Sequence, residues 1–329
     1  MTYLVTGAQG FIGSWVVKNL IEMGRGVVVY DLDIQPKRLA QILSTEQLQG
    51  ITFVRGDVCD LEAIGNAVKE HGVEKIIHLA GLQIPACQAD PRRGAMVNVL
   101  GTLNIFEAAL ANKIDNVVYA SSAAVAGKPE DYDEKVFTPT SIPRPRSHYG
   151  VFKQCNEGNA RIYFETRGLS SVGLRPWAVY GVGRDFGLTS DPTKAIKAAV
   201  MGVPFKIQFG GCANMQYADD IAKIFLLCAD AELKGAHAFN LQGEVLDVDQ
   251  MIGVIEKVVP GAQGLITHGD LNLPLISAFD DSDLRGTLGA LPHTPFEEGV
   301  RQTAGIFSAL LAQGRLPFEE IAAAAAART

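Results

Sequence analysis

The sequence predicts an α/β protein in which a doubly wound parallel sheet carries a smaller lobe interleaved with its C-terminal half. Short apolar runs alternate with segments of helical spacing along residues 1–180, which favours a parallel sheet covered by helices on both faces. The run 27–30 reads Val-Val-Val-Tyr without polar alternation, as a strand buried on both faces requires. Glycines directly follow the first run, at the sheet edge where such folds bind their ligands.

These periodicities predict the elements in chain order. Apolar and β-branched runs predict strands at 2–6, 26–30, 51–54, 75–79, 116–120 and 171–175. The segments between them predict helices at 13–23, 61–70, 93–112 and 149–167. In the first helix, Trp15, Val16, Leu20 and Met23 recur at the spacing of one helical face.

The composition changes after residue 180. Residues 181–192 are rich in Gly and Asp, and 204–217 predict short strands and turns. Further predicted elements are helices at 218–231, 248–259 and 295–313, a strand at 236–241, and a frayed Ala-rich helix at 322–327. We therefore expect a sheet domain, residues 1–178 plus about 213–247, and a smaller lobe, about 179–212 and 248–329.

Charge and cysteine content exclude several classes of protein. The 329 residues hold 29 Lys and Arg against 36 Asp and Glu, without the basic stripe that nucleic acid binding needs. We find no run of about 18 apolar residues and no signal-peptide pattern, so we expect a cytoplasmic protein without a membrane span. The five cysteines are widely spaced and lack a Cys-x-x-Cys pair, so we expect reduced thiols and no metal site.

The turn after the first strand has the composition of a phosphate-binding loop. Gly7, Gly10 and Gly13 let the backbone approach a pyrophosphate, and the helix that follows offers unpaired N–H groups at its N-terminus. Gln9, Phe11 and Ile12 complete the loop and are expected to contact the same ligand. The turn therefore predicts that the sheet domain is a Rossmann-type dinucleotide-binding domain and that the smaller lobe binds substrate.

Asp31 closes the second predicted strand, 24 residues after Gly7. A carboxylate there accepts hydrogen bonds from the ribose 2′-OH and repels a 2′-phosphate, which favours NAD over NADP. Lys37 and Arg38 follow closely and could reach a phosphate, so NADP stays an alternative.

Tyr149 and Lys153 are four residues apart on a predicted helix, so their side chains leave from one face. A phenol with an ordinary pKa near 10 is a poor base, and a neighbouring ammonium lowers that pKa. Ser122 ends the preceding strand at the ligand-binding edge, where its hydroxyl can orient a substrate oxygen and the phenol. The alternative is a surface Tyr–Lys pair beside a serine turn.

Several motifs in this order resemble the extended short-chain dehydrogenase/reductase family, specifically its NAD-dependent epimerase/dehydratase group. The resemblance covers nearly the whole chain. It rests on residues 6–13, Asp31, 56–58, 78–81, 98–102, 121–122, 149–153, 174–176, 180–181 and 217–220.

This resemblance implies a catalytic triad of Ser122, Tyr149 and Lys153, with Tyr149 and Lys153 also contacting NAD. It places five further residues along the cofactor: Asp57 and Val58 beside the adenine, then Ala80, Gly81 and Gln83. Asn98 matches a motif position near the cofactor, although a structural role is equally open. The family also implies a homodimer built from helices 93–112 and 149–167.

The chain departs from the family in three places. Ala123 and Ala124 stand where dehydratases resemble Asp-Glu, so we do not expect dehydration. The stretches 211–217 and 274–280 lack the arginines that hold a nucleotide-sugar diphosphate in the family, which favours a smaller, non-nucleotide substrate. Arg184 and Thr189 are then the candidate substrate contacts, with a loop salt bridge and a helix N-cap as the alternatives.

We therefore expect an NAD-dependent oxidoreductase that transfers hydride at a secondary hydroxyl of a small, sugar-like substrate. The sequence leaves open whether it is a dehydrogenase or an epimerase. The alternatives are a nucleotide-sugar 4-epimerase with tightly held NAD, an NADP-linked carbonyl reductase, and a non-catalytic dinucleotide sensor.

Overall fold

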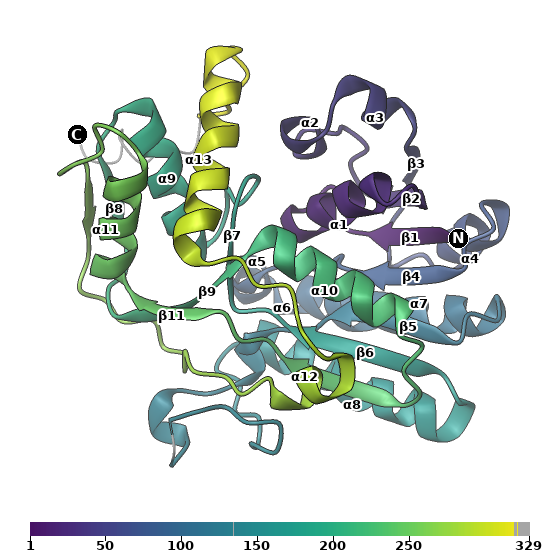
Figure 1. Ribbon diagram of the computed structural model, residues 1–329. Coiled ribbons are helices and arrows are strands. Elements are labelled where there is room, and N and C mark those ends of the chain that lie inside the picture. The colour runs from purple at the N-terminus through teal and green to yellow at the C-terminus, as the bar shows by residue number, and fades with distance from the viewer. Residues whose placement is uncertain (134, 319–320, 322–329) are drawn as a thin grey trace.

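The computed structural model describes residues 1–133, 135–318 and 321, and its centre is a seven-stranded parallel sheet (Figure 1). The strand order is β10-β6-β5-β4-β1-β2-β3. The strands are β1 (Thr2–Thr6), β2 (Gly26–Asp31), β3 (Thr52–Arg55), β4 (Lys75–His78), β5 (Asn116–Ala120), β6 (Ser170–Arg175) and β10 (Ala236–Asn240). The order reverses between β1 and β4, so the ligand crevice is expected at the carboxyl ends of these two strands. The predicted doubly wound fold is confirmed.

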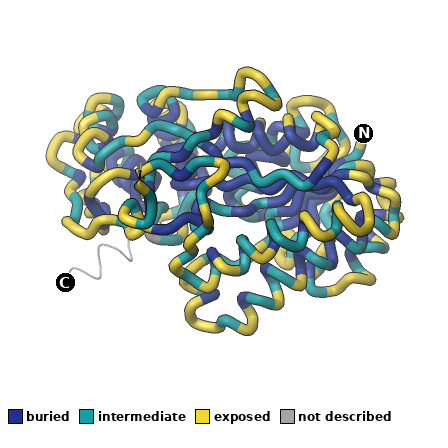
Figure 2. The backbone as a smooth tube through the Cα atoms, turned by 90° about the horizontal axis from the view of Figure 1, so that it is seen from below, coloured by how far each residue is buried: buried dark blue, intermediate teal, exposed yellow. Residues whose placement is uncertain are grey.

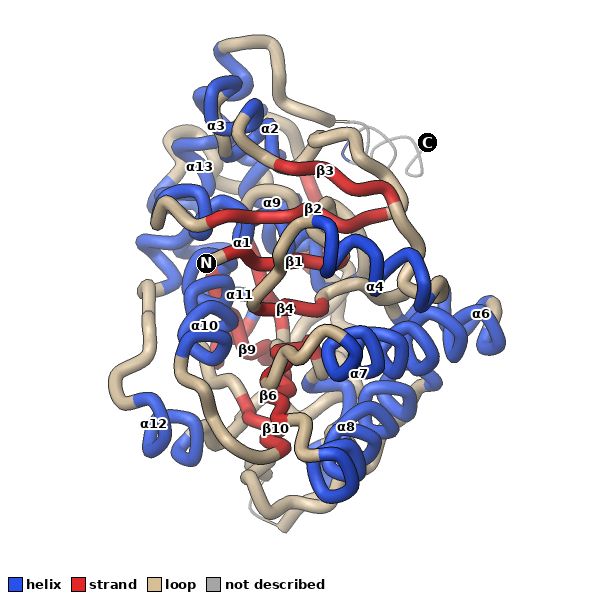
Figure 3. Tube along the Cα trace, turned by 90° about the vertical axis from the view of Figure 1, so that its right-hand side faces the viewer, coloured by secondary structure: helices blue, strands red, loops and turns tan. Residues whose placement is uncertain are grey.

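Helices cover both faces of this sheet (Figure 3). On one face α1 (Phe11–Glu22) and α10 (Ala218–Asp230) lie over strand residues such as Tyr3 and Val5. On the other face α4 (Leu61–Glu70), α7 (Gly101–Ala111) and α8 (His148–Arg167) lie over residues such as Leu4 and Val28. Because neighbouring strand residues point to opposite faces, both sets must be apolar, which explains the unbroken apolar runs. Buried backbone follows these strands through the centre of the molecule (Figure 2).

The predicted helix at 93–112 is confirmed as one continuous helical segment, Pro91–Ala111, which contains a π-helical turn that was not predicted. The segment consists of α6 (Pro91–Ala95), the π-helical turn η1 (Met96–Leu100) and α7, and the short helix α5 (Ile84–Ala89) precedes it. Asn98 lies in the π-helical turn and its Nδ2 donates to the carbonyls of Gly94 and Leu82, at 3.0 and 3.2 Å. The segment Pro91–Ala111 is long and apolar enough to span a membrane. Half of its most apolar 18-residue stretch is buried inside the protein, as in a core helix.

A smaller lobe surrounds the carboxyl edge of the sheet. It contains a three-stranded sheet of β7 (Ala178–Tyr180), β9 (Cys212–Tyr217) and β11 (Glu244–Asp247), and a parallel pair, β8 (Phe205–Ile207) and β12 (Ile266–His268). Three helices pack on one another here: α9 (Asp191–Met201), α11 (Val248–Val258) and α13 (Phe296–Ala312). The short helices of the chain are α2 (Leu39–Ile42), α3 (Thr45–Gln49), η2 (Ala123–Val125), η3 (Pro129–Asp131), η4 (Leu188–Ser190) and α12 (Ser282–Leu288).

The two lobes share the chain in alternation. Strands β9 and β11 pair with each other, whereas α10 and β10, which lie between them in sequence, belong to the central sheet and its cover. The proposed residue boundaries of the two domains stay a prediction, although β9 and β11, which the prediction includes in the sheet domain, pair outside the central sheet. The predicted helix at 322–327 lies outside the described residues.

Candidate active site

The turn between β1 and α1 brings the backbone close to itself and to β4. Gly7 has a positive φ of 65°, and a Cβ there would lie 2.6 Å from the Ala80 nitrogen. A Cβ at Gly13 would lie 2.3 Å from the Gly7 carbonyl oxygen, so the helix can approach the strand only with glycine at this position. Gly10 is the N-cap of α1, and Phe11 and Ile12 are its first two residues. Their N–H groups and the helix dipole form the type of site that binds phosphate.

Asp31 lies at the end of β2 beside this turn. Its carboxylate accepts from the backbone nitrogens of Gln9, at 2.9 Å, and Asp33, at 3.4 Å. Burial raises the pKa of Asp31 above its usual range, and these N–H donors oppose the shift. The carboxylate is therefore fixed in place at the edge of the crevice.

A cavity of about 370 Å³ extends from the glycine turn past Asp31. Eight of the predicted cofactor residues line it: Gly7, Gln9, Gly10, Asp31, Asp57, Val58, Ala80 and Gly81. Phe11, Ile12 and Gly13 lie in the first turn of α1, and Gln83 is the N-cap of α5. The side-chain amide of Gln9 is buried, and neither of its polar atoms has a partner in the described part of the chain. Buried polar atoms are almost always paired, so the amide is suited to a polar ligand in this cavity. These features fit a dinucleotide.

Arg38 is already engaged within the protein. Its guanidinium donates to both carboxylate oxygens of Asp185, at 2.7 and 3.1 Å, and to the Gln9 carbonyl at 3.0 Å. This pairing across 147 residues makes Arg38 a link between the glycine turn and the 181–189 loop. Because Asp185 already neutralises it, Arg38 is a poor partner for a 2′-phosphate, and only Lys37 of the two cations stays open for that role.

Helix α8 carries Tyr149 and Lys153 to the end of β5. The Ser147 hydroxyl caps the helix by accepting from the Gly150 nitrogen at 3.1 Å, and a Cβ at Gly150 would lie 2.2 Å from the Ala124 carbonyl. Lys153 is 4% exposed and donates to the Ala120 carbonyl at 2.7 Å, with its Nζ 5.5 Å from the centre of the Tyr149 ring.

Ser122 completes this cluster. Its hydroxyl oxygen accepts from the Ala124 nitrogen at 3.1 Å, and the hydroxyl lies close enough to Tyr149 to act on the pKa of that phenol. The three residues that sequence motifs selected therefore lie together.

Burial dominates the electrostatics of the cluster. It lowers the pKa of Lys153 to about 8, against the opposing effects of Cys87 and Glu157. Burial also raises the pKa of Tyr149, while the hydrogen bond with Ser122 and the positive charge of Arg184 act to lower it. Tyr149 therefore holds its proton in the resting protein, and added positive charge nearby favours the phenolate.

Two polar residues of the family motifs have structural roles here. His78 is buried between the hydroxyls of Thr6, at 2.7 Å, and Thr102, at 3.1 Å, and burial lowers its pKa to about 3. It is therefore a neutral hydrogen-bonding residue. A Cβ at Gly81 would lie 2.7 Å from the Asn98 Oδ1 atom, so Asn98 sets how closely this segment approaches the π-helical turn.

The sequence reasoning missed a buried ion pair behind the cluster. Arg175, at the end of β6, forms two 2.8 Å hydrogen bonds with Glu157, which also accepts from the Ser121 hydroxyl at 2.5 Å. Glu157 is four residues after Lys153, on the same helical face, and that spacing was the available signal. Arg175 also donates to the Asn240 side-chain oxygen. Hydrogen bonds therefore connect the ends of β5, β6 and β10 to α8.

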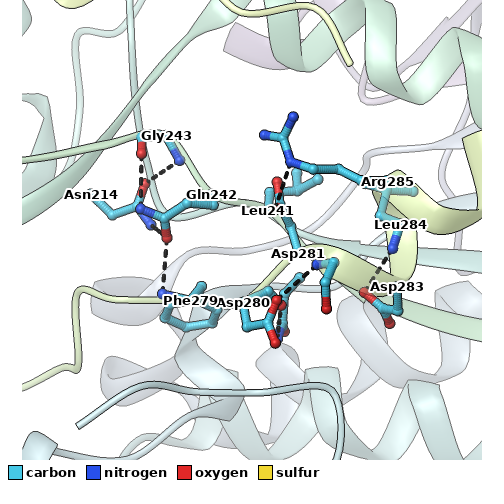
Figure 4. A network of polar contacts seen from close by, with 12 residues as sticks. Asn214, Leu241, Gln242, Gly243, Phe279, Asp280, Asp281, Asp283, Leu284 and Arg285 are labelled. Atoms are coloured by element: carbon cyan, nitrogen blue, oxygen red, sulfur yellow. Dashed lines mark hydrogen bonds and ion pairs between the residues drawn. The ribbon is translucent and has the colours of Figure 1, made fainter. Parts of the chain in front are cut away.

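The stretches 211–217 and 274–280 carry no cation, and their polar groups are used inside the fold (Figure 4). Asn214 donates to the Gln242 side-chain oxygen at 2.9 Å, and that oxygen also accepts from the Phe279 nitrogen. The Ile276 carbonyl accepts from the Trp177 indole at 2.7 Å. This network joins the two stretches to each other and to the sheet.

The two predicted substrate contacts, Arg184 and Thr189, are bonded to each other. Arg184 donates to the Thr189 hydroxyl at 2.9 Å. The alternative for Arg184, a salt bridge with its neighbour, does not form, because Asp185 pairs with Arg38 instead. Thr189 lies inside η4 and is not the N-cap residue of α9, which is Ser190.

The sheet, the glycine turn and the Tyr149 cluster together define a protein of the short-chain dehydrogenase/reductase class with a Rossmann-type domain. The chain belongs to the NAD dependent epimerase/dehydratase family, whose profile matches residues 3–241. Its cofactor is NAD. The predicted family and cofactor are confirmed.

Three relatives illustrate the similarity. The chain is 30% identical over 317 residues to a UDP-glucose 4-epimerase of Mycolicibacterium smegmatis, covering 93% of this chain and 98% of that protein. It is 32% identical over 324 residues to a UDP-glucose 4-epimerase of Azospirillum brasilense, covering 92% and 90%. The solved UDP-glucose 4-epimerase of Thermus thermophilus, in complex with NAD, is 26% identical, with a TM-score of 0.79 and coverage of 93% and 99%.

Proposed function

We propose that this protein oxidises a secondary hydroxyl of a sugar-like substrate, with Ser122, Tyr149 and Lys153 as its catalytic residues. The observation that carries the proposal is the convergence of these three side chains at the end of β5, beside the cavity that fits a dinucleotide. Parallel α/β sheets bind and transform ligands at this edge.

Each catalytic residue has a task that its contacts support. Tyr149 takes the proton of the substrate hydroxyl, and Ser122 hydrogen-bonds both the phenol and the substrate oxygen. Lys153, held on the Ala120 carbonyl, supplies positive charge beside the Tyr149 ring and stabilises the phenolate. When bound, NAD supplies the hydride acceptor and a further positive charge.

We propose that the substrate is not a nucleotide sugar. A diphosphate needs charge-assisted donors, and the stretches 211–217 and 274–280 offer none. The second candidate is a nucleotide-sugar 4-epimerase, and the similarity to UDP-glucose 4-epimerases along nearly the whole chain favours it. In either case Ala123 and Ala124 provide no carboxylate acid for eliminating water, so the proposed reaction is dehydrogenation or epimerisation.

We also propose that the protein is a cytoplasmic homodimer. Apolar side chains are exposed along η1 and one side of α8, namely Met96, Leu100, Val151 and Ile162. Such a group is suited to covering by a second copy. Light scattering of the wild type and of Val151→Glu tests this: a dimer that becomes a monomer supports the proposal, and a monomeric wild type contradicts it.

The function is tested with purified protein, NAD, and a panel of free sugars, sugar acids and nucleotide sugars. Reduced cofactor and isomerised product are measured separately. Stoichiometric NADH identifies a dehydrogenase, isomer without net NADH identifies an epimerase, and turnover of nucleotide sugars alone would sink the non-nucleotide assignment. Tyr149→Phe should remove activity, whereas Tyr163→Phe should not, because Tyr163 lies on the same helix but bonds Glu107 away from the cluster.

A further inference from the structure

Arg184 is a partly buried cation that forms no ion pair in the described part of the chain. It lies in the loop between β7 and α9, and its Nε atom is buried with no hydrogen-bond acceptor in residues 1–133, 135–318 and 321. Its Nη2 atom donates to the neutral Thr189 hydroxyl at 2.9 Å, and no ion pair joins Arg184 to a carboxylate within the same described ranges. Burial lowers the pKa of Arg184, although the guanidinium keeps its charge in proteins.

The one nearby carboxylate in sequence is already neutralised. Asp185 forms two hydrogen bonds with Arg38, and Arg38 also donates to the Gly183 carbonyl at 3.0 Å. This double attachment holds the loop against the glycine turn and engages both Asp185 oxygens with Arg38, although the charge of Asp185 still acts on Arg184. The loop therefore fixes the position of Arg184 while Asp185 forms its ion pair with Arg38.

The surroundings of the guanidinium belong to the active site. It lies 5.7 Å from the centre of the Phe11 ring, at the N-terminus of α1, and its charge acts on Tyr149. A Cβ at Gly187 would lie 3.8 Å from Arg184 Nη2 and 3.0 Å from Gln83 Oε1, so the Gln83 side chain lies near the guanidinium. Arg184 therefore lies between the phosphate-binding turn and the catalytic tyrosine.

We propose that Arg184, supported by Thr189, binds an oxyanion carried by the substrate, a carboxylate or a phosphate. The substrates would then be anionic sugars, which deepens the proposed function and rests on it. A cation with a buried N–H group that lacks an acceptor raises the free energy of the folded protein. An oxyanion that accepts from Nε and the remaining guanidinium N–H groups would offset this penalty. The pyrophosphate of NAD shares this chemistry, but the N–H groups of the first turn of α1 are suited to it, whereas the charge of Arg184 acts on Tyr149.

The test measures binding by calorimetry on NAD-saturated protein, with galactose, galacturonate and galactose 1-phosphate as probes. Wild type should bind at least one of the two anionic probes about tenfold more tightly than galactose. Arg184→Gln should abolish that preference while the NAD affinity stays within about twofold, and Arg184→Lys should keep part of it. Arg301→Gln is the matched control, because Arg301 is exposed on α13 and pairs with Glu297 and Glu298.

Three results would overturn the inference. The first is a wild-type protein that binds neither anionic probe more tightly than galactose. This result needs no variant, so the test remains valid even if Arg184→Gln does not fold. An unchanged preference in Arg184→Gln would make the residue a packing element. A loss of NAD affinity of about tenfold would assign Arg184 to the cofactor pyrophosphate. None of these readouts requires turnover, so they are distinct from a failure of the catalytic proposal.

Discussion

Replacing Lys153 by Met should stabilise the fold while removing the proposed catalytic ammonium. In the folded protein burial lowers the pKa of Lys153 from 10.5 to about 8. At about 1.4 kcal/mol per pH unit, this shift means that the charged lysine costs the folded state about 3 kcal/mol. Loss of the hydrogen bond to the Ala120 carbonyl offsets about 1 kcal/mol, which leaves a net gain of about 2 kcal/mol for Lys153→Met near neutral pH.

The sign of the pH dependence follows from the same shift. Below pH 8 the lysine is protonated in the folded and in the unfolded protein, so the charged side chain destabilises the folded state by the full amount. Between about 8 and 10.5 the folded protein loses this proton first, so the unfolded chain binds more protons and wild-type stability rises relative to the variant. Above 10.5 the cost is gone, and the advantage of Lys153→Met disappears.

The assay is urea unfolding followed by circular dichroism, with nucleotide removed, at about pH 7 and about pH 10. Lys69→Met, at an exposed position on α4, is the matched control and should change stability by less than about 0.5 kcal/mol. A Lys153→Met variant that is less stable than wild type near neutral pH, or a difference that does not shrink with rising pH, would show that burying the charged lysine does not destabilise the fold.

Three further predictions concern the cofactor and the proton. Tyr149→Phe should lower turnover by about 10²–10⁴ while NAD affinity, measured by fluorescence titration, stays the same. Gly13→Ala places a Cβ 2.3 Å from the Gly7 carbonyl, so it should abolish NAD binding and lower the melting temperature, seen by calorimetry. Asp31→Ala should weaken NAD binding and lower the ratio of NAD affinity to NADP affinity by about tenfold, because it removes the carboxylate that the Gln9 nitrogen holds in place. An unchanged affinity ratio would contradict this.

The sequence predicted the central sheet well because its signals are local. Strands buried on both faces are continuously apolar, so 2–6 and 116–120 coincide with β1 and β5. Helix α9 was missed because it is buried around most of its circumference, which removes the periodicity that reveals a surface helix. The π-helical turn inside the helix was not predicted; in it, Asn98 donates to the carbonyls of Gly94 and of Leu82, which lies 16 residues away.

The same distinction applies to the site. The glycine turn and the Tyr149–Lys153 spacing are complete within a few residues, and the structure brings both to one sheet edge. Arg38 was interpreted as a possible phosphate ligand because its partner Asp185 lies 147 residues away and no local pattern links them. The Glu157–Arg175 pair depends likewise on the fold, since two different elements contribute its members.

Above all, we propose that Tyr149 removes a proton from a sugar-like hydroxyl while bound NAD is reduced. The most direct measurement is the absorbance of reduced cofactor in a single turnover of the NAD-loaded protein, recorded with the sugar panel for wild type and Tyr149→Phe. At least one sugar-type compound should reduce the cofactor in the wild type, and Tyr149→Phe should lose this signal. No reduction and no isomer with any compound, or the same signal in Tyr149→Phe, would contradict the proposal.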